Sequence, residues 1–125
     1  TENVVTALPR TTIFECEKTM VTQGFRRLPI VSDGEAVGII TTMDIIRFFG
    51  SGQVFKHLRS GTIIQVLNTP ALDIAGKPVV TTEPEADVGQ AAKTMHEKNI
   101  GAMPVVKSGK LVGIITERDF FKIIE

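Results

Sequence analysis

The chain has 125 residues, of which 42% are apolar and 22% are charged, as in ordinary globular domains. Fourteen Lys and Arg residues balance fourteen Asp and Glu residues, which excludes a general attraction to nucleic acid or to an anionic membrane. No apolar run approaches the roughly 20 residues that a membrane-spanning helix needs. Cys16 is the only cysteine, so no internal disulfide can form and a reducing, cytoplasmic compartment is expected. With only His57 and His96 besides, a protein-held metal ion is not expected.

Each of two similar segments opens with a short strand and a helix. The strand is predicted around Val4-Val5 and again around Val79-Val80. Thr12 and Asp87 are residues that favour a helix N-cap, and the apolar residues after them recur at helical spacing. Cys16 lies on that apolar face, so we expect its side chain to pack in the core rather than to react.

An antiparallel hairpin and a second helix follow. Residues 28–31 and 36–40 are apolar runs of strand type that flank a turn sequence, and the same pattern returns 75 residues later. The second helix is expected to start at Thr41 in one segment and at Thr116 in the other. Each segment therefore reads as β-α-β-β-α.

The two segments are copies of one unit. Residues 5–50 align without a gap on residues 80–125, and 15 of the 46 aligned pairs are identical. Chance would give only a few identities, so the chain contains an internal duplication. One copy alone would expose a large apolar sheet face. We therefore predict an α/β fold in which two tandem repeats pack with pseudo-twofold symmetry.

The predicted domain boundaries follow from the duplication. Residues 1–55 form the first repeat, residues 56–78 the connecting segment, and residues 79–125 the second repeat. Residues 53–59 are predicted to be helical, and a short helix is predicted at residues 62–67.

The duplicated motif places a hydroxyl and a carboxylate where a strand meets a helix. Thr41 and Asp44 carry these groups in the first repeat, and Thr116 and Asp119 carry them in the second. A helix start offers unpaired N–H groups that can hold a phosphate, and a carboxylate can accept two hydroxyl protons from a ribose diol. The same Thr-x-x-Asp pattern is also a helix capping box. The two interpretations are compatible, because the threonine can serve in both.

Three arginines break the symmetry of the repeat. Arg26 and Arg27 align with Gly101-Ala102, and Arg118 aligns with Met43, so the fold itself does not require these charges. Arginine is suited to bidentate recognition of phosphate. A solvated surface position is the alternative for each of the three.

These residues resemble the CBS-domain family, which has paired β-α-β-β-α repeats, an x-Pro-Val strand and a Gly-h-h-Thr/Ser-x-x-Asp motif, where h is apolar. Pro104-Val105 matches the strand pattern, and Ile30 after Pro29 is a mild variant. Residues 116–119, Thr-Glu-Arg-Asp, are close to a frequent form of the motif. The resemblance covers nearly the whole chain. It departs in one respect, because the first copy lacks the helix that commonly precedes its first strand.

The resemblance implies a regulatory module that binds AMP, ADP or ATP in two symmetry-related clefts. In such modules the aspartate holds the ribose diol, and apolar residues enclose the adenine. By position, the resemblance assigns to the Asp44 cleft Thr41, Ile39, Val88, Ile100 and Gly101, and to the Asp119 cleft Thr116, Ile114, Ile13, Phe25 and Arg26. Arg26, Arg27 and Arg118 match positions where the family often has phosphate ligands.

We find no nucleophile paired with a base and no P-loop, so no enzyme activity, catalytic residue or catalytic cofactor is expected. The adenine nucleotide is expected as a ligand, and a regulated partner protein or domain is expected to respond to it. A homodimer is also predicted, because the apolar helix faces with Phe48-Phe49 and Phe120-Phe121 are expected to stay uncovered in a chain of 125 residues and symmetric dimers are the commonest assembly. One alternative is a structural or dimerisation module with empty clefts. Another is a different adenosyl ligand, such as S-adenosylmethionine or NAD.

Overall fold

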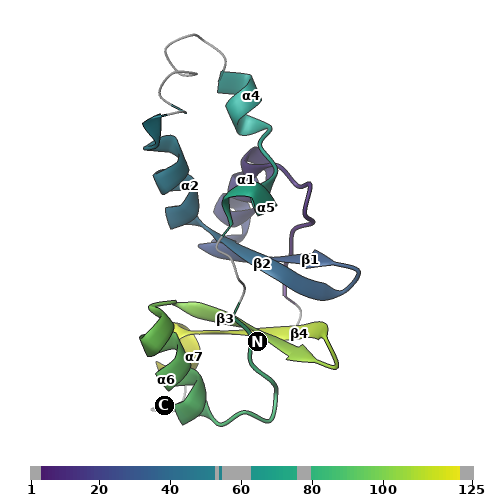
Figure 1. The fold of residues 1–125 in the computed structure, drawn as a ribbon, viewed down its shortest axis with the longest axis vertical. Helices are drawn as coiled ribbons and strands as arrows, with labels where there is room; N and C mark the ends of the chain where they lie inside the picture. Colours follow the sequence, from purple (N-terminus) through teal and green to yellow (C-terminus); the bar gives the residue numbers. More distant parts are fainter. Residues whose placement is uncertain (1–3, 53, 55–62, 76–79, 122–125) are drawn as a thin grey trace. The chain divides into compact units, whose positions relative to one another are not determined.

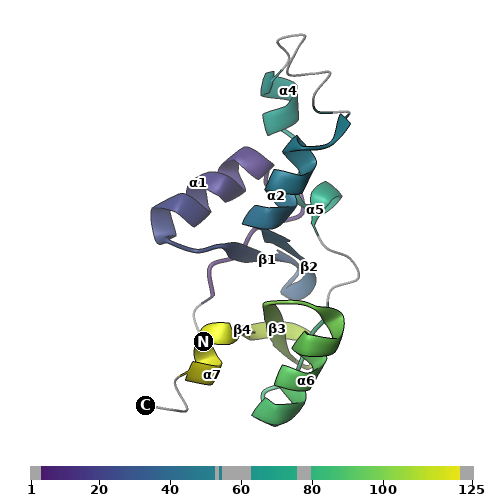
Figure 2. The same cartoon turned by 90° about the vertical axis from the view of Figure 1, so that its left-hand side faces the viewer.

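The computed structural model describes residues 4–52, 54, 63–75 and 80–121 (Figures 1 and 2). The chain divides into two compact units. The N-terminal unit contains residues 5–32 and 37–79, and the C-terminal unit contains residues 80–125 together with residues 1–4 and the turn at residues 33–36. This mixed arrangement of helices and two small antiparallel sheets confirms the predicted α/β class.

Helix α1, Ile13–Gln23, forms where the N-cap pattern predicts it. The Thr12 side chain accepts a hydrogen bond from the backbone N–H of Glu15 at 3.2 Å. The helix ends at Gly24, whose φ of 72° is left-handed and suits a residue without a side chain. The buried face of α1 includes Cys16, whose side chain is fully buried. Burial is the main reason why the pKa of the Cys16 thiol is raised to about 11, so the thiol is protonated at neutral pH and packs as an apolar group.

Strands β1, Arg27–Ser32, and β2, Glu35–Thr41, form the predicted hairpin. Asp33 and Gly34 both have positive φ, 52° and 81°, as in the type I′ turn that matches the twist of a hairpin. Helix α2, Thr42–Phe49, follows directly.

The strand predicted around Val4-Val5 is reduced to a single parallel bridge between Ala7 and Ile30. The Ala7 N–H donates to the carbonyl of Pro29 at 2.9 Å, and the Val31 N–H donates to the Ala7 carbonyl at 2.8 Å. Because proline has no N–H, this side of β1 offers few donors, which limits the pairing to one bridge.

The core of the N-terminal unit lies between the hairpin and its helices. Both views show α1 and α2 on the same face of the β1–β2 ribbon (Figures 1 and 2). The phenylalanines Phe48 and Phe49 meet edge to face, with ring centroids 6.0 Å apart, and pack against this core. The buried residues of the core are Ala7, Ile13, Cys16, Met20, Leu28, Ile30, Ile40, Ile45, Ala71 and Ala75.

Part of the predicted connecting segment packs into this core. Helix α4, Ile63–Leu67, confirms the predicted short helix, whereas helix α5, Ala71–Ile74, was not predicted. Ala71 is fully buried. A side chain at Gly38 would bring a Cβ within 3.1 Å of a Leu72 methyl group, so this glycine allows α5 to approach β2 closely. The helix predicted at residues 53–59 lies outside the described residues.

The C-terminal unit repeats this local structure. Helix α6, Val88–Lys98, begins after the predicted cap Asp87. The Asp87 carboxylate accepts hydrogen bonds from the backbone N–H groups of Gly89 and Gln90. Asn99 has a φ of 54° and ends α6 in the left-handed conformation that Gly24 adopts after α1. Asparagine tolerates this conformation better than other residues with side chains, so the two copies end their helices alike.

Strands β3, Ala102–Lys107, and β4, Lys110–Thr116, form the second predicted hairpin. They pair antiparallel, and Ala102 lies opposite Thr116. Helix α7, Glu117–Phe121, follows at once. The buried residues of this core are Ala91, Met95 and Met103, and Val80, Ile100, Ile115 and Phe120 pack against them.

None of the helices in the described part of the chain has the length and apolar character needed to span a bilayer.

Candidate functional site

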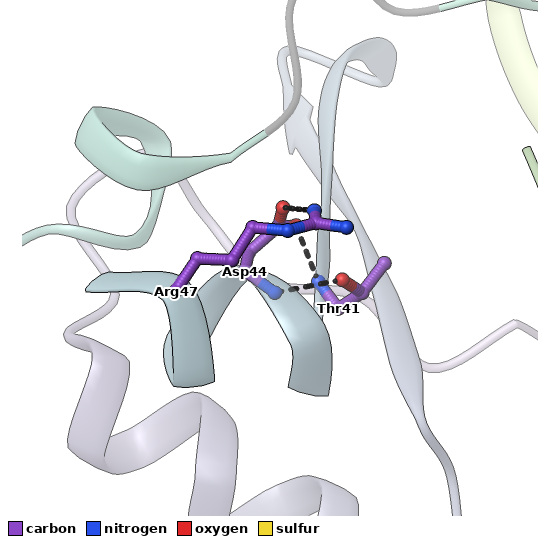
Figure 3. A network of polar contacts seen from close by, with 3 residues as sticks. All are labelled: Thr41, Asp44 and Arg47. Atoms are coloured by element: carbon purple, nitrogen blue, oxygen red, sulfur yellow. Dashed lines mark hydrogen bonds and ion pairs between the residues drawn. The ribbon is translucent and has the colours of Figure 1, made fainter. Parts of the chain in front are cut away.

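The first Thr-x-x-Asp motif is a complete capping box. Thr41 ends β2 in an extended conformation and caps α2. Its hydroxyl accepts a hydrogen bond from the Asp44 N–H at 3.0 Å, and the Asp44 Oδ2 accepts one from the Thr41 N–H at 2.8 Å. Figure 3 shows both bonds. The capping interpretation is therefore confirmed for this motif, and the carboxylate is fixed at the start of the helix.

The second motif forms a similar but not identical cap. The Thr116 N–H donates to the Asp119 Oδ2 at 2.8 Å, the same distance as in the first motif. The Thr116 hydroxyl accepts instead from the Arg118 N–H at 3.3 Å, one residue earlier than in the first motif. Both copies thus hold an aspartate carboxylate at the point where a strand ends and a helix begins.

Asp44 has a neighbour that the sequence analysis did not identify. The guanidinium Nη1 of Arg47 lies 3.8 Å from the Asp44 Oδ1, and both side chains come from α2 (Figure 3). Residues three positions apart on a helix are neighbours on its surface, so the spacing Asp44 to Arg47 was the signal in the sequence. The Asp44 side chain is only 14% exposed, whereas that of Arg47 is 72% exposed.

Arg26 and Arg27 differ in burial and in position. Arg26 is exposed and Arg27 is half-buried at the start of β1. The carbonyl of Arg26 accepts a hydrogen bond from the Thr42 N–H at 2.9 Å. This bond holds the backbone of Arg26 beside the first turn of α2 and therefore beside the Thr41–Asp44 cap. The third arginine, Arg118, is exposed in the first turn of α7.

The predicted contacts of adenine fall into three groups by burial. Phe25 and Val88 are each 44% exposed and can contact a ligand. Ile13 is only 1% exposed and belongs to the core of the N-terminal unit. The half-buried members of the predicted set are Ile39, Ile100, Gly101 and Ile114.

The aligned positions 13 and 88 therefore differ in burial. The Ile13 N–H donates to the Thr69 carbonyl at 2.9 Å, and the Ala71 N–H donates to the Thr11 carbonyl at 2.7 Å. The segment before α5 thus runs along the start of α1 and covers it. Val88 begins α6 with its side chain partly exposed.

Across the described residues, no three His, Cys, Asp or Glu side chains come together as a metal ion would require. Both motifs carry one carboxylate, one hydroxyl and backbone N–H groups. This set can hold hydroxyl groups and anions by hydrogen bonds.

The sequence model of the CBS domain matches residues 1–51 and 71–125. The chain belongs to the CBS-domain family. The chain is 38% identical over 123 residues to the uncharacterized protein MJ1225 of Methanocaldococcus jannaschii, covering 98% of this chain and 44% of that protein. It is 39% identical over 119 residues to an uncharacterized 33.4 kDa protein of Thermofilum pendens, covering 95% of this chain and 40% of that protein. The chain thus spans less than half the length of these relatives.

Solved structures confirm the CBS-pair fold. The crystal structure of MJ1225 matches with a TM-score of 0.94 at 37% identity, covering 100% of this chain and 45% of that one. The CBS-domain pair of protein MJ0100, solved with 5′-methylthioadenosine and S-adenosyl-L-methionine, matches with a TM-score of 0.77 at 28% identity. That match covers 99% of this chain and 90% of the MJ0100 chain. The predicted CBS-domain pair is therefore confirmed.

Proposed function

We propose that this CBS pair is a regulatory module that binds adenine nucleotides through its two Thr-x-x-Asp motifs. The observation that carries the proposal is the aspartate carboxylate held at a helix start in both repeats, with Asp44 only 14% exposed. Capping leaves such a carboxylate with lone pairs for a ligand, because each ionised oxygen can accept more than one hydrogen bond. In this proposal Asp44 and Asp119 accept hydrogen bonds from ribose hydroxyls.

The related MJ0100 pair supports an adenosyl ligand, since it was solved with 5′-methylthioadenosine and S-adenosyl-L-methionine. The MJ1225 protein has been proposed as an archaeal homologue of g-AMPK, which favours a nucleotide. Both kinds of ligand share the adenosine moiety. The arginines near the motifs favour a phosphate-bearing ligand in this chain, and S-adenosylmethionine is the second candidate.

Isothermal titration calorimetry against AMP, ADP, ATP, adenosine, NAD and S-adenosylmethionine tests the proposal. We expect adenosine-containing ligands to bind and the phosphate-bearing ones to bind most tightly. Ligand at about 100 times its dissociation constant should raise the free energy of unfolding by roughly 2.7 kcal/mol. If none of the six compounds binds or shifts thermal unfolding, the nucleotide proposal is wrong and a structural or dimerisation module remains.

The arginines should separate AMP from adenosine. We expect Arg26→Ala or Arg118→Ala to weaken AMP binding by about tenfold, because a charge-assisted bond to phosphate contributes about 1.5 kcal/mol or more. Adenosine binding should change less than twofold, and raising the salt concentration should weaken only AMP. Arg27→Ala is measured in parallel, with a check of its fold, because Arg27 is half-buried.

The control for this comparison is Lys93→Ala, which removes an exposed positive charge on α6 outside the predicted phosphate positions. Lys93→Ala should leave both affinities unchanged. Equal losses of AMP and adenosine binding in the arginine variants would show that the arginines do not recognise phosphate. Because the arginines are not repeated in both copies, one motif should bind AMP more tightly than the other. Two sites of equal AMP affinity would contradict this expectation.

The phenylalanines from which a dimer was predicted do not form an open face, because Phe48 and Phe49 pack against the N-terminal core and Phe120 packs against the C-terminal core. We propose instead that the unit forms a homodimer through other apolar helix positions, which are exposed. Phe14 and Val21 are 53% and 71% exposed on one face of α1, and Met43 and Ile46 are 49% and 60% exposed on α2. Exposed apolar side chains gathered on helix faces are typical of association surfaces. Sedimentation velocity should show a dimer that the variant Val21→Glu converts to monomer. Only monomer for the unsubstituted chain at high micromolar concentration would remove this proposal.

A further inference from the structure

The two oxygens of the Asp44 carboxylate have different surroundings. Oδ2 accepts the Thr41 N–H at 2.8 Å and so belongs to the helix cap. Oδ1 faces the guanidinium of Arg47, with 3.8 Å between Oδ1 and Nη1 (Figure 3). The cap fixes the carboxylate, so Arg47 is not needed to orient it.

The distance between Oδ1 and Arg47 is too long for a direct hydrogen bond. An N–H···O bond between charged groups spans about 2.7–2.9 Å, so the 3.8 Å pair is held only by the attraction of the two charges. An exposed pair of this kind contributes about 1 kcal/mol or less, and the Arg47 side chain is 72% exposed. Little free energy is therefore lost when a ligand group enters between the two side chains.

A hydroxyl group has the size and the chemistry for this position. Its oxygen can lie about 2.7 Å from Oδ1 and about 2.9 Å from Nη1 at the same time, because the sum of these two distances exceeds the 3.8 Å between Oδ1 and Nη1. The hydroxyl donates its proton to the carboxylate and accepts an N–H from the guanidinium. Both bonds involve a charged partner, so each is stronger than a bond between neutral groups.

We propose that Arg47 is a ligand-binding residue that, together with Asp44, recognises one ribose hydroxyl between the carboxylate and the guanidinium. This inference rests on the proposed adenosyl site at Asp44. It adds a residue that discriminates between ribose and deoxyribose ligands. A ligand that lacks the bridging hydroxyl leaves both charged groups without their shared partner and loses both bonds together.

The test combines a protein variant with ligands that lack one hydroxyl. Adenosine, 2′-deoxyadenosine and 3′-deoxyadenosine are titrated into the chain with Arg47 and into Arg47→Met, both carrying Asp119→Asn so that only the Asp44 site remains. Methionine keeps an unbranched side chain and good helix propensity but removes every donor. Neutral nucleosides are used so that no phosphate contributes. Arg47→Lys is the conservative variant, since its ammonium can still donate.

We expect Arg47→Met to weaken adenosine binding by about three- to tenfold, as the loss of one exposed charge-assisted bond predicts. The same substitution should change the affinity for one of the two deoxyadenosines by less than twofold, because the hydroxyl that Arg47 contacts is already absent. Arg47→Lys should restore part of the adenosine affinity. The midpoints of thermal unfolding of the Arg47 variants should stay within about 4 °C of that of the chain with Arg47, as the loss of a surface pair implies.

Several outcomes overturn the inference while the proposed function stands. They are unchanged or tighter adenosine binding in Arg47→Met, an equal loss for all three nucleosides, and adenosine binding by the unsubstituted chain that disappears in Asp119→Asn alone. Unchanged or tighter adenosine binding in Arg47→Met would show that Arg47 does not bind the ligand and only competes with it for the Asp44 Oδ1. An equal loss for all three nucleosides would show that Arg47 does not contact one particular hydroxyl. If the unsubstituted chain binds neither nucleosides nor nucleotides, the proposed function itself is wrong.

Discussion

Replacing Asp44 with alanine is expected to remove ligand binding at the first motif, with a loss of affinity of about a hundredfold or more. Two hydroxyl bonds to a charged acceptor are lost, and each contributes about 1.5–3 kcal/mol when water is excluded. Calorimetry with AMP should show one binding event fewer per chain. The equivalent substitution Asp119→Ala should remove the other event.

The structure adds an effect on stability to this prediction. The Thr41 N–H donates to the Asp44 Oδ2, so Asp44→Ala leaves this donor without its partner and should lower the free energy of unfolding by about 1 kcal/mol. Asp44→Asn is the matched variant. Its amide oxygen can still accept from Thr41, so it should keep most of the stability, whereas its neutral amide cannot accept two hydroxyl protons.

These two variants separate capping from recognition. If recognition is correct, Asp44→Asn binds ligand nearly as weakly as Asp44→Ala while unfolding at almost the temperature of the unsubstituted chain. If Asp44 serves only the cap, Asp44→Ala unfolds at lower temperature and both variants bind AMP as tightly as the unsubstituted chain.

Adjacent isoleucines on α2 should differ greatly in their contribution to stability. Ile45 is 8% exposed and belongs to the core of the N-terminal unit, whereas Ile46 is 60% exposed. Ile45→Ala should lower the free energy of unfolding by about 2–4 kcal/mol, through the lost burial of three carbon atoms and the cavity that remains. Ile46→Ala should change it by about 0.5 kcal/mol or less.

The comparison controls itself, because the two substitutions remove the same atoms from the same helix and gain the same helix propensity. Urea unfolding followed by circular dichroism gives both values, and Ile45→Ala should lower the midpoint of thermal unfolding by about 6–15 °C. Similar losses for the two variants would show that α2 does not pack on the hairpin with Ile45 inward. The measurement is made at low protein concentration, so that association through Ile46 does not contribute.

Local signals in the sequence account for most of the fold. Thr12 and Asp87 predicted the helix starts because an N-cap depends only on residues one to three positions away. The residues Asp33-Gly34 predicted a tight hairpin, because a two-residue turn needs two consecutive residues with positive φ and an Asp-Gly pair adopts this conformation readily. The constant 75-residue spacing then transferred each prediction from one copy to the other. The repeat also showed that the Thr-x-x-Asp motif occurs in both copies. The motif by itself did not decide whether its residues cap a helix, bind a ligand or do both.

The sequence by itself thus determined the duplication, the two hairpins and the two carboxylates at helix starts. Turns and helix caps depend on residues only a few positions apart, and the duplication is visible as the 75-residue repeat. The tertiary structure alone decided which of two aligned residues is buried, since Ile13 is 1% exposed and Val88 is 44% exposed. It also decided that α5 packs into the N-terminal core and that the Arg26 carbonyl meets the Thr42 N–H. These features depend on residues far apart in the chain, whose approach is set by the packing of whole elements and leaves no local pattern.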